Sequence, residues 1–252
     1  MDLLISLAKH IPDNKSVVLL CQSIDDISDF SLTEEEKTYL SNRFDKDAKC
    51  VAINRYKHFI YVQKTDAQLE GNRLAAKALH SSICQEKIEH ITIVDKSHQP
   101  KVAWAFAEGL ALSNYQFLKY FTDKKENSLK EISLHSANGE DEINQLKAVI
   151  EGTYLAKDLV NEPFSYLTAL QYSQDIEKMG KEAGFKVEVL HKKKIEELKM
   201  GGLLAVNKGS IDPPTFSILE WKPKTKFREL AKMMVEADLK HLEEHGLEPQ
   251  DK

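Results

Sequence analysis

The residue types that could do metal chemistry are concentrated in one short segment near the end of the printed sequence. His241, Glu244 and His245 match the H-x-x-E-H pattern, in which two imidazoles one helical turn apart can bind the same zinc ion. A catalytic zinc usually needs three protein ligands, and only seven residues follow His245. We therefore favour the alternative, a solvated helix end whose histidines complement the carbonyl dipole before Gly246.

Other residues that could act as bases or bind phosphate are scattered. His90, His98 and His135 lie near expected strand ends, but no serine or cysteine is identifiably paired with them, so we expect hydrogen-bonded structural histidines. The run 192–194 consists of three lysines without interleaved aromatic residues, which is typical of a solvated surface. The sequence contains neither a P-loop nor a G-x-G-x-x-G motif.

The charge balance and the cysteines limit the classes of binding partner and the cellular compartment that we expect. The chain has 35 basic and 40 acidic side chains and a net charge of −5, which disfavours sequence-independent nucleic-acid binding, although a local basic patch remains open. Cys21, Cys50 and Cys84 form no C-x-x-C pair and are expected to be buried in a reducing compartment. The longest apolar stretch, 102–112, is too short for a membrane span, so we expect a cytoplasmic protein without a membrane partner.

The first half of the chain alternates short apolar runs with longer amphipathic ones, which is typical of strands and helices packed in layers. We expect strands at 16–21, 51–54, 59–62, 90–95 and 131–135. Helices are expected to about residue 45 after a cap at Ser31 or Thr33, from a cap at Asp66 to about residue 86, and at 102–120. The second of these helices should bury Leu69, Leu74, Ala78 and Ile83.

The second half begins after a composition break at 136–139. We expect a long helix at 141–160 ended by Pro163, a second helix at 168–183 stopped by Gly184, and a strand at 187–190. Further along we expect a helical turn at 195–198, a glycine-led strand at 201–206 and a strand at 216–221. A charged amphipathic helix is expected at 227–245.

Several ordered motifs occur between residues 156 and 221. They read A-K-D-L-V-N-E-P at 156–163, L-T at 167–168, V-E-V-L at 187–190, M-G-G-L-L-A-V-N-K-G-S at 200–210, P-P at 213–214 and L-E at 219–220. In this order they resemble the leucine aminopeptidase (cytosol aminopeptidase) family. The region 1–135 is similar in layout to the macro-domain-like N-terminal domain of that family. Read as residues alone, the motifs are turns, caps and helix ends, and thus scaffold.

The resemblance implies enzymes that release N-terminal residues from peptides with two divalent metals, commonly zinc, manganese or magnesium. In the family, a lysine in a V-G-K-G-V-type turn, an F-D-[ST]-G-G segment and an N-T-D-A-E-G-R segment carry the ligands and an arginine. None of the three occurs in this sequence, and Lys208 falls in an earlier turn. We therefore assign no catalytic, cofactor-binding or metal-binding residue, expect no cofactor in this chain, and expect a truncated member that is inactive alone.

The predicted fold class is α/β. We expect a macro-like α/β domain at 1–138, a linker helix at 139–163, an incomplete aminopeptidase catalytic domain at 164–221 and a divergent helical tail at 222–252. The family's usual hexamer is not expected, but exposed strand edges would favour homo-oligomers. One alternative is a macro-like module that binds ADP-ribose-like ligands without hydrolysis; another is a tail joined from a different reading frame or design.

Overall fold

A computed structural model describes residues 3–99, 101–135, 139–222 and 235. The chain separates into two compact units, Met1–Asn161 and Glu162–Lys252, which we call the N-terminal unit and the C-terminal unit. None of the described helices combines the length and apolar character that a bilayer crossing requires. The expected tail helix at 227–245, with His241, Glu244 and His245, lies outside the described residues.

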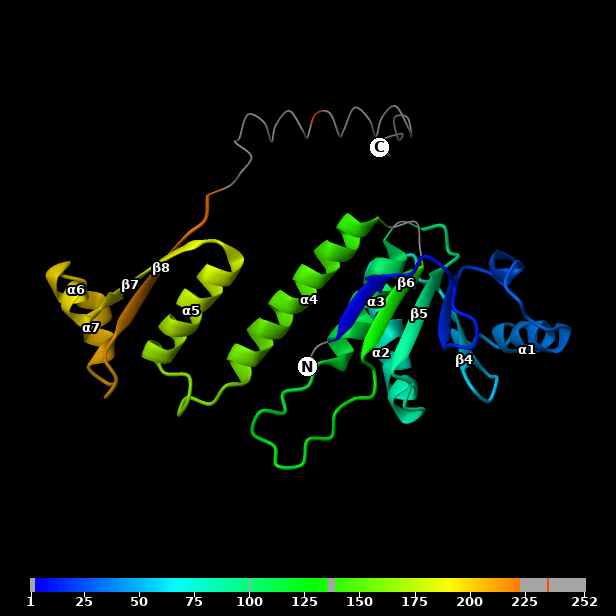
Figure 1. Cartoon of the computed structure of the whole chain (residues 1–252), viewed down its shortest axis with the longest axis horizontal. Coiled ribbons are helices and arrows are strands. Elements are labelled where there is room, and N and C mark those ends of the chain that lie inside the picture. Colours follow the sequence, from blue (N-terminus) through cyan, green and yellow to red (C-terminus); the bar gives the residue numbers. More distant parts are fainter. Residues whose placement is uncertain (1–2, 100, 136–138, 223–234, 236–252) are drawn as a thin grey trace. The chain divides into compact units, whose positions relative to one another are not determined.

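The N-terminal unit is built on a six-stranded sheet with the order β1-β6-β5-β2-β4-β3 (Figure 1). Neighbouring strands are parallel except β3, which runs antiparallel to β4 at one edge. The strands are β1 Leu4–Leu7, β2 Val17–Cys21, β3 Cys50–Asn54, β4 Phe59–Lys64, β5 His90–Asp95 and β6 Glu131–His135. This parallel-dominated α/β sheet confirms the predicted fold class.

The helices of the N-terminal unit pack against opposite faces of the sheet because successive strand residues point to opposite sides. The helix α1 (Glu34–Phe44) shares one apolar cluster with alternate residues of β2, β3 and β4. The other cluster joins the sheet to α2 (Leu69–Gln85), α3 (Val102–Asn114) and α4 (Glu140–Asn161). All five residues of β2 are buried, as expected for a central strand covered on both faces.

The C-terminal unit contains a smaller antiparallel pair of strands, β7 (Lys186–His191) and β8 (Thr215–Glu220). Its helices are α5 (Ala169–Ala183), α6 (Lys192–Glu197) and α7 (Gly201–Asn207). The Thr168 hydroxyl accepts a hydrogen bond from the Gln171 amide at the start of α5, and Gly184 ends the helix with a φ of 76°. Among its described apolar side chains, those that are buried are Ile176, Leu190, Ile195 and Pro214.

Local sequence patterns predicted most of the helices and strands, but several predicted ends and buried helix faces were wrong. The segment 201–206, expected as a strand, forms α7, because the Leu204 amide bonds back to the Met200 carbonyl in a helical turn. The helix expected to reach residue 120 ends at Asn114, where Tyr115 turns to an extended backbone. On α2, the exposed residues include Leu74 and Ala78, which were expected to be buried.

Two further features of the N-terminal unit differ from the expectation. The N-cap of α2 is Gln68 rather than Asp66, whose carboxylate accepts a hydrogen bond from the Gln68 amide just before the helix. The strand β1 was not expected, and it pairs with β6 far along the chain. Both features depend on contacts that hydrophobic spacing does not report.

Candidate functional site

The first family motif forms the end of α4 and contacts the segment that follows α3. The Tyr115 hydroxyl donates to Asp158 Oδ1 at 2.7 Å and accepts from Asn161 Nδ2 at 3.1 Å. The Lys157 ammonium lies 4.8 Å from the centre of the Tyr115 ring. Partial burial, followed by the hydrogen bond to the Asp158 carboxylate, raises the pKa of Tyr115. The cluster fixes the last turns of α4 and presents no nucleophile paired with a base.

The second family motif forms α7 and the turn after it. The Asn207 side chain donates to the Asp212 carbonyl at 2.9 Å, and the Ser210 amide donates to the Asn207 carbonyl at 2.9 Å. Lys208 caps α7, is exposed, and forms no ion pair within the part of the chain that the structure describes. The motif therefore shapes a helix and a turn, in keeping with the scaffold interpretation.

The candidate histidines do not form a cluster, and their contacts are those of structural residues. His90 Nδ1 lies 2.9 Å from Glu131 Oε2. Burial alone would raise the pKa of Glu131, but hydrogen bonds from His90, Ser6 and Ser133 outweigh it and lower that pKa. His135 Nδ1 contacts the Ala8 carbonyl at 3.0 Å. His98 lies in the loop after β5 with a φ of 56°.

One histidine contact was missed from the sequence, although an i, i+4 spacing on α2 signals it. His80 Nε2 lies 3.0 Å from Asn114 Oδ1 and 3.5 Å from Cys84 Sγ. A base that activates a thiol must use one ring nitrogen for the sulfur and the other for its orienting partner. Here both contacts involve the same nitrogen of a buried ring, so the trio joins α2 to α3 and does not form a catalytic triad.

The cysteines are free thiols, with Cys21 buried and Cys50 and Cys84 half-buried. Burial raises the pKa of Cys21 to about 12 and that of Cys50 to about 11. Both thiols therefore stay protonated at neutral pH, which makes them poor nucleophiles and poor metal ligands.

The resemblance implies a centre with two divalent metals, and the described residues do not fit one. Such ions need several oxygen, nitrogen or sulfur donors converging on one point. Within residues 3–99, 101–135, 139–222 and 235, no group of three or more His, Cys, Asp or Glu side chains could hold a metal ion. We therefore derive no reaction step for these residues.

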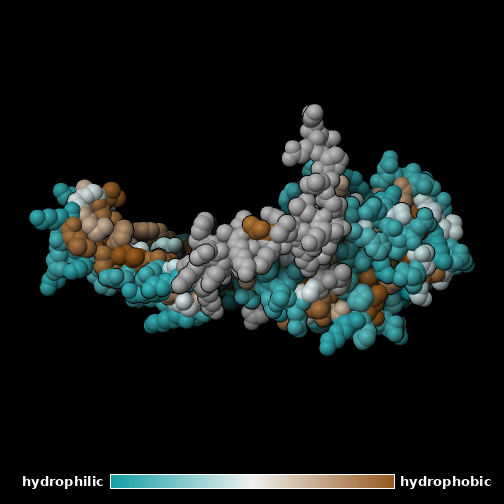
Figure 2. Space-filling view, turned by 90° about the horizontal axis from the view of Figure 1, so that it is seen from above, coloured by the Kyte–Doolittle hydropathy of each residue, from teal (hydrophilic) through white to brown (hydrophobic). Residues whose placement is uncertain are grey.

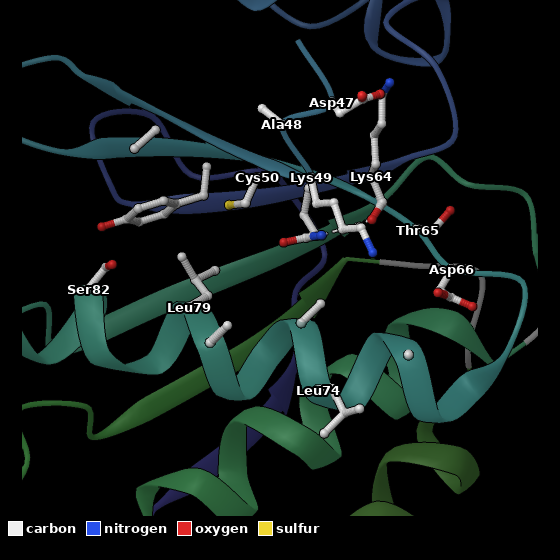
Figure 3. Close-up of a pocket in the computed structure, with 16 residues that line it drawn as sticks. Asp47, Ala48, Lys49, Cys50, Lys64, Thr65, Asp66, Leu74, Leu79 and Ser82 are labelled. Atoms are coloured by element: carbon white, nitrogen blue, oxygen red, sulfur yellow. Dashed lines mark hydrogen bonds between the residues drawn. The ribbon is translucent and has the colours of Figure 1, made fainter. Parts of the chain in front are cut away.

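A cavity of about 930 Å³ opens in the N-terminal unit between β3, β4 and α2 (Figure 3). Its strand side includes Cys50, Ala52, Tyr61 and Gln63, and its helix side runs from Gly71 to Ser82. None of the residues singled out for chemistry in the sequence, apart from Cys50, lines it. Sequence reasoning missed this site because its walls come from segments that are separate in the chain.

Comparisons with known proteins agree with the fold and with the motifs. The sequence model of the cytosol aminopeptidase family, catalytic domain, matches residues 154–235 and so extends beyond Trp221, where the motifs end. A probable cytosol aminopeptidase of Sulfurihydrogenibium sp. (strain YO3AOP1) is 37% identical over 137 residues, covering 52% of this chain and 27% of the relative. That of Chloroherpeton thalassium is 59% identical over 69 residues, 27% of this chain and 14% of the relative.

Solved structures show the same fold at low sequence identity. A tomato leucine aminopeptidase mutant superposes with a TM-score of 0.72 and 17% identity, over 89% of this chain and 52% of that one. The bottromycin maturation enzyme BotP, in complex with Mn, gives a TM-score of 0.66 and 21% identity, over 85% of this chain and 46% of that one. These two solved chains define the class as the α/β architecture of the leucine aminopeptidases.

The chain belongs to the cytosol aminopeptidase family and spans part of it. It covers 36% of a Chlorobium phaeobacteroides relative at 35% identity over 179 residues, and smaller shares of the two relatives named above. The predicted family is thereby confirmed for a partial chain. The activity and partners of whole relatives remain matters for proposal.

Proposed function

We propose that this chain provides the N-terminal domain and the opening part of the catalytic domain of a leucyl aminopeptidase-like protein that acts on peptides. The match of residues 154–235 to the catalytic domain of the family carries this proposal. In the division we propose, residues 1–138 form the N-terminal domain, 139–163 the linker helix, 164–221 the first part of the catalytic domain, and 222–252 a tail that diverges from the family beyond residue 235, where the match ends.

We also propose that the polypeptide of these 252 residues does not hydrolyse peptides by itself. The three ligand-bearing segments of the family do not occur in its sequence, and the described residues offer no donor set for a metal. A macro-like binding module without hydrolytic activity has less support as the main role, because the matched relatives are named aminopeptidases.

The decisive assay measures leucinamide hydrolysis by the purified chain with added manganese or zinc. We expect no turnover, while the Sulfurihydrogenibium relative, assayed in parallel, provides the positive control. Metal-dependent turnover that co-purifies with the 252-residue mass would contradict the proposed inactivity.

A chimera tests whether the scaffold itself is competent. Residues 1–221 would be joined to the remainder of the Chloroherpeton thalassium relative, with which this chain shares 59% identity over 69 residues. We expect a folded chimera with metal-dependent aminopeptidase activity, because the motifs at 156–221 would position the added segments. A chimera that folds but stays inactive would count against the assignment.

Two further proposals concern the surroundings of the protein. We propose a cytoplasmic location, supported by the names of the relatives as cytosol aminopeptidases.

We also propose self-association through exposed apolar strand residues of the C-terminal unit, such as Phe216 and Ile218. Sedimentation of the purified chain checks the second proposal, which a monodisperse monomer would contradict.

A further inference from the structure

The cavity between β3, β4 and α2 lies where the small side chains of the sheet edge and of the helix leave space between them. On one face of β3, Val51 and Ile53 join the cluster with α1. On the other face, β3 lines the cavity with Cys50 and Ala52, and α2 lines it with small residues such as Ala75 and Ala78. Small side chains on both walls leave a hollow of about 930 Å³. This volume lies within the range of small-molecule sites.

Two buried hydroxyl groups line this cavity without a protein partner. Tyr61 is 2% exposed, and its hydroxyl makes no hydrogen bond to any described residue. The Thr65 hydroxyl, at the end of the same strand, is also buried and unpartnered. Buried polar groups are normally hydrogen-bonded, so two such groups beside one cavity point to a polar ligand. Burial raises the pKa of Tyr61 to about 12, so its hydroxyl can donate at neutral pH.

The mouth of the cavity carries one free cation, Lys49, and two carboxylates, Asp47 and Asp66. Figure 3 shows the Lys49 side chain reaching toward α2, whereas Lys64 turns away from α2 toward Asp47. In the described part of the chain, Lys49 forms no ion pair or side-chain hydrogen bond, while the Lys64 ammonium lies 4.7 Å from the centre of the Phe44 ring. Asp66 uses Oδ1 to accept from the Gln68 amide at 2.8 Å, which leaves Oδ2 available.

The wall formed by α2 is apolar. Leu79 points toward the strands, whereas the Leu74 side chain, which is 56% exposed, is directed to the other side of α2 (Figure 3). An apolar group placed on the wall beside Leu79 would remove the exposed Ala78 from water, which is favourable in proportion to the area covered.

We propose that this cavity binds a small zwitterion with an apolar side chain, of the class of free aliphatic amino acids and their dipeptides. The ligand carboxylate pairs with Lys49, its ammonium with Asp66, and its apolar side chain packs on Ala78 and Leu79. The Tyr61 and Thr65 hydroxyls lie four residues apart along the chain, so a dipeptide, which offers a peptide group beyond its carboxylate, can bond to either of them and binds more tightly than one amino acid. This binding does not require aminopeptidase activity.

Calorimetry on the full 252-residue chain tests the ligand class. We expect saturable heat with leucine and with leucyl-leucine, and tighter binding of the dipeptide. N-acetylleucine lacks the ammonium and leucinamide lacks the carboxylate, so each should bind about tenfold more weakly than leucine, as for the loss of one charged contact. No saturable heat with either zwitterion at millimolar concentration, or equal binding of the capped compounds, would overturn the proposal.

Variants of the chain test the site itself. We expect Lys49→Gln to weaken leucyl-leucine binding about tenfold and Tyr61→Phe to weaken it several-fold, while Lys57→Gln, at an exposed lysine of the β3–β4 turn, leaves it unchanged. The melting temperature separates binding from structure, because Tyr61→Phe removes an unpartnered buried hydroxyl and should keep or raise it. Unchanged affinity in both Lys49→Gln and Tyr61→Phe would place the ligand elsewhere and refute the assignment.

Discussion

The two units differ in how far each encloses its own apolar residues. In β2 of the N-terminal unit all five residues are buried, whereas in β8 of the C-terminal unit four of six are exposed. Figure 2 shows apolar residues gathered on the surface of the C-terminal unit, where exposed side chains include Val206, Ile218, Leu219 and Trp221. Its two-stranded sheet and helices bury few apolar side chains, so the described part of this unit has only a small core.

The residues that form the core and the residues that carry the family motifs lie mostly in different units. The residues that carry the strongest family motifs lie mostly in the C-terminal unit, which the described residues leave open to solvent. The residues that form a complete core lie in the N-terminal unit, ahead of most of the match. The most specific family motifs and the completed core therefore lie largely in different parts of this chain, although similarity to the relatives extends into the N-terminal unit.

The largest difference between the two units is expected when each is produced as a separate polypeptide and its folding is measured. Residues 1–161 should fold alone, because both faces of the central strands are covered within that segment. Residues 162–222 alone should show no cooperative transition, since few apolar side chains there are buried. Amide NMR dispersion and urea titration of each segment provide the measurement. Cooperative unfolding of 162–222 would remove the contrast.

A matched pair of isoleucine truncations measures the contrast residue by residue. Ile93→Ala on β5 removes a fully buried side chain and should lower the free energy of unfolding by about 2–5 kcal/mol. In the monomer, at dilute concentration, Ile218→Ala on β8 should cost less than about 1 kcal/mol, because that side chain is 41% exposed there.

Urea unfolding monitored by tryptophan fluorescence reports the two units separately, since Trp104 and Trp221 lie in different units. Trp221→Phe leaves the signal of the N-terminal unit, and Trp104→Phe leaves that of the C-terminal unit. Equal costs for the two truncations would show that β8 is buried in solution, for instance in an oligomer.

A smaller, pH-dependent effect on the free energy of unfolding is expected at α1. The hydrogen bond from Arg55 is the main cause that lowers the pKa of Glu36 from 4.5, and the Thr33 amide adds to it. A lowered pKa stabilises the fold above the ordinary value, and the benefit is lost as the pH falls through the lower value of the folded state. Glu36→Gln should therefore cost about 1–2 kcal/mol at neutral pH and progressively less in acid.

Denaturant titrations between neutral pH and acid check this dependence. Glu177→Gln, at an exposed carboxylate on α5 of the C-terminal unit, is the matched control and should leave the stability of the N-terminal unit unchanged. A cost for Glu36→Gln that does not change with pH would assign the effect to packing rather than to charge.

Local chemistry made much of the fold predictable from the sequence. The cap at Thr33, one of the two residues expected there, and the stop at Gly184 each act within a few residues, and both occur. The strand predicted at 90–95 also forms, but four consecutive residues of it are buried rather than alternate ones. The strand at 201–206 was wrong because a short apolar run has no period that separates strand from helix.

Features that depend on distant residues could not be predicted in this way. The helix α3 ends at Asn114, whose side chain bonds to the Leu129 carbonyl and to His80 on α2. The cavity is the strongest case, since Lys49, Tyr61 and Asp66 come together only through the pairing of β3 with β4 and the placement of α2. Hydrophobic spacing reports none of these contacts.

The pairing of β1 with β6 has a consequence for synthesis of the chain. Residue Leu4 aligns with Glu131, and among the described strands β1 pairs with β6 alone. During synthesis β1 must therefore wait, with its backbone amides bonded to water or a chaperone, until about 130 further residues have been translated. Ribosome-bound nascent chains that stop short of β6 should remain accessible to protease at β1.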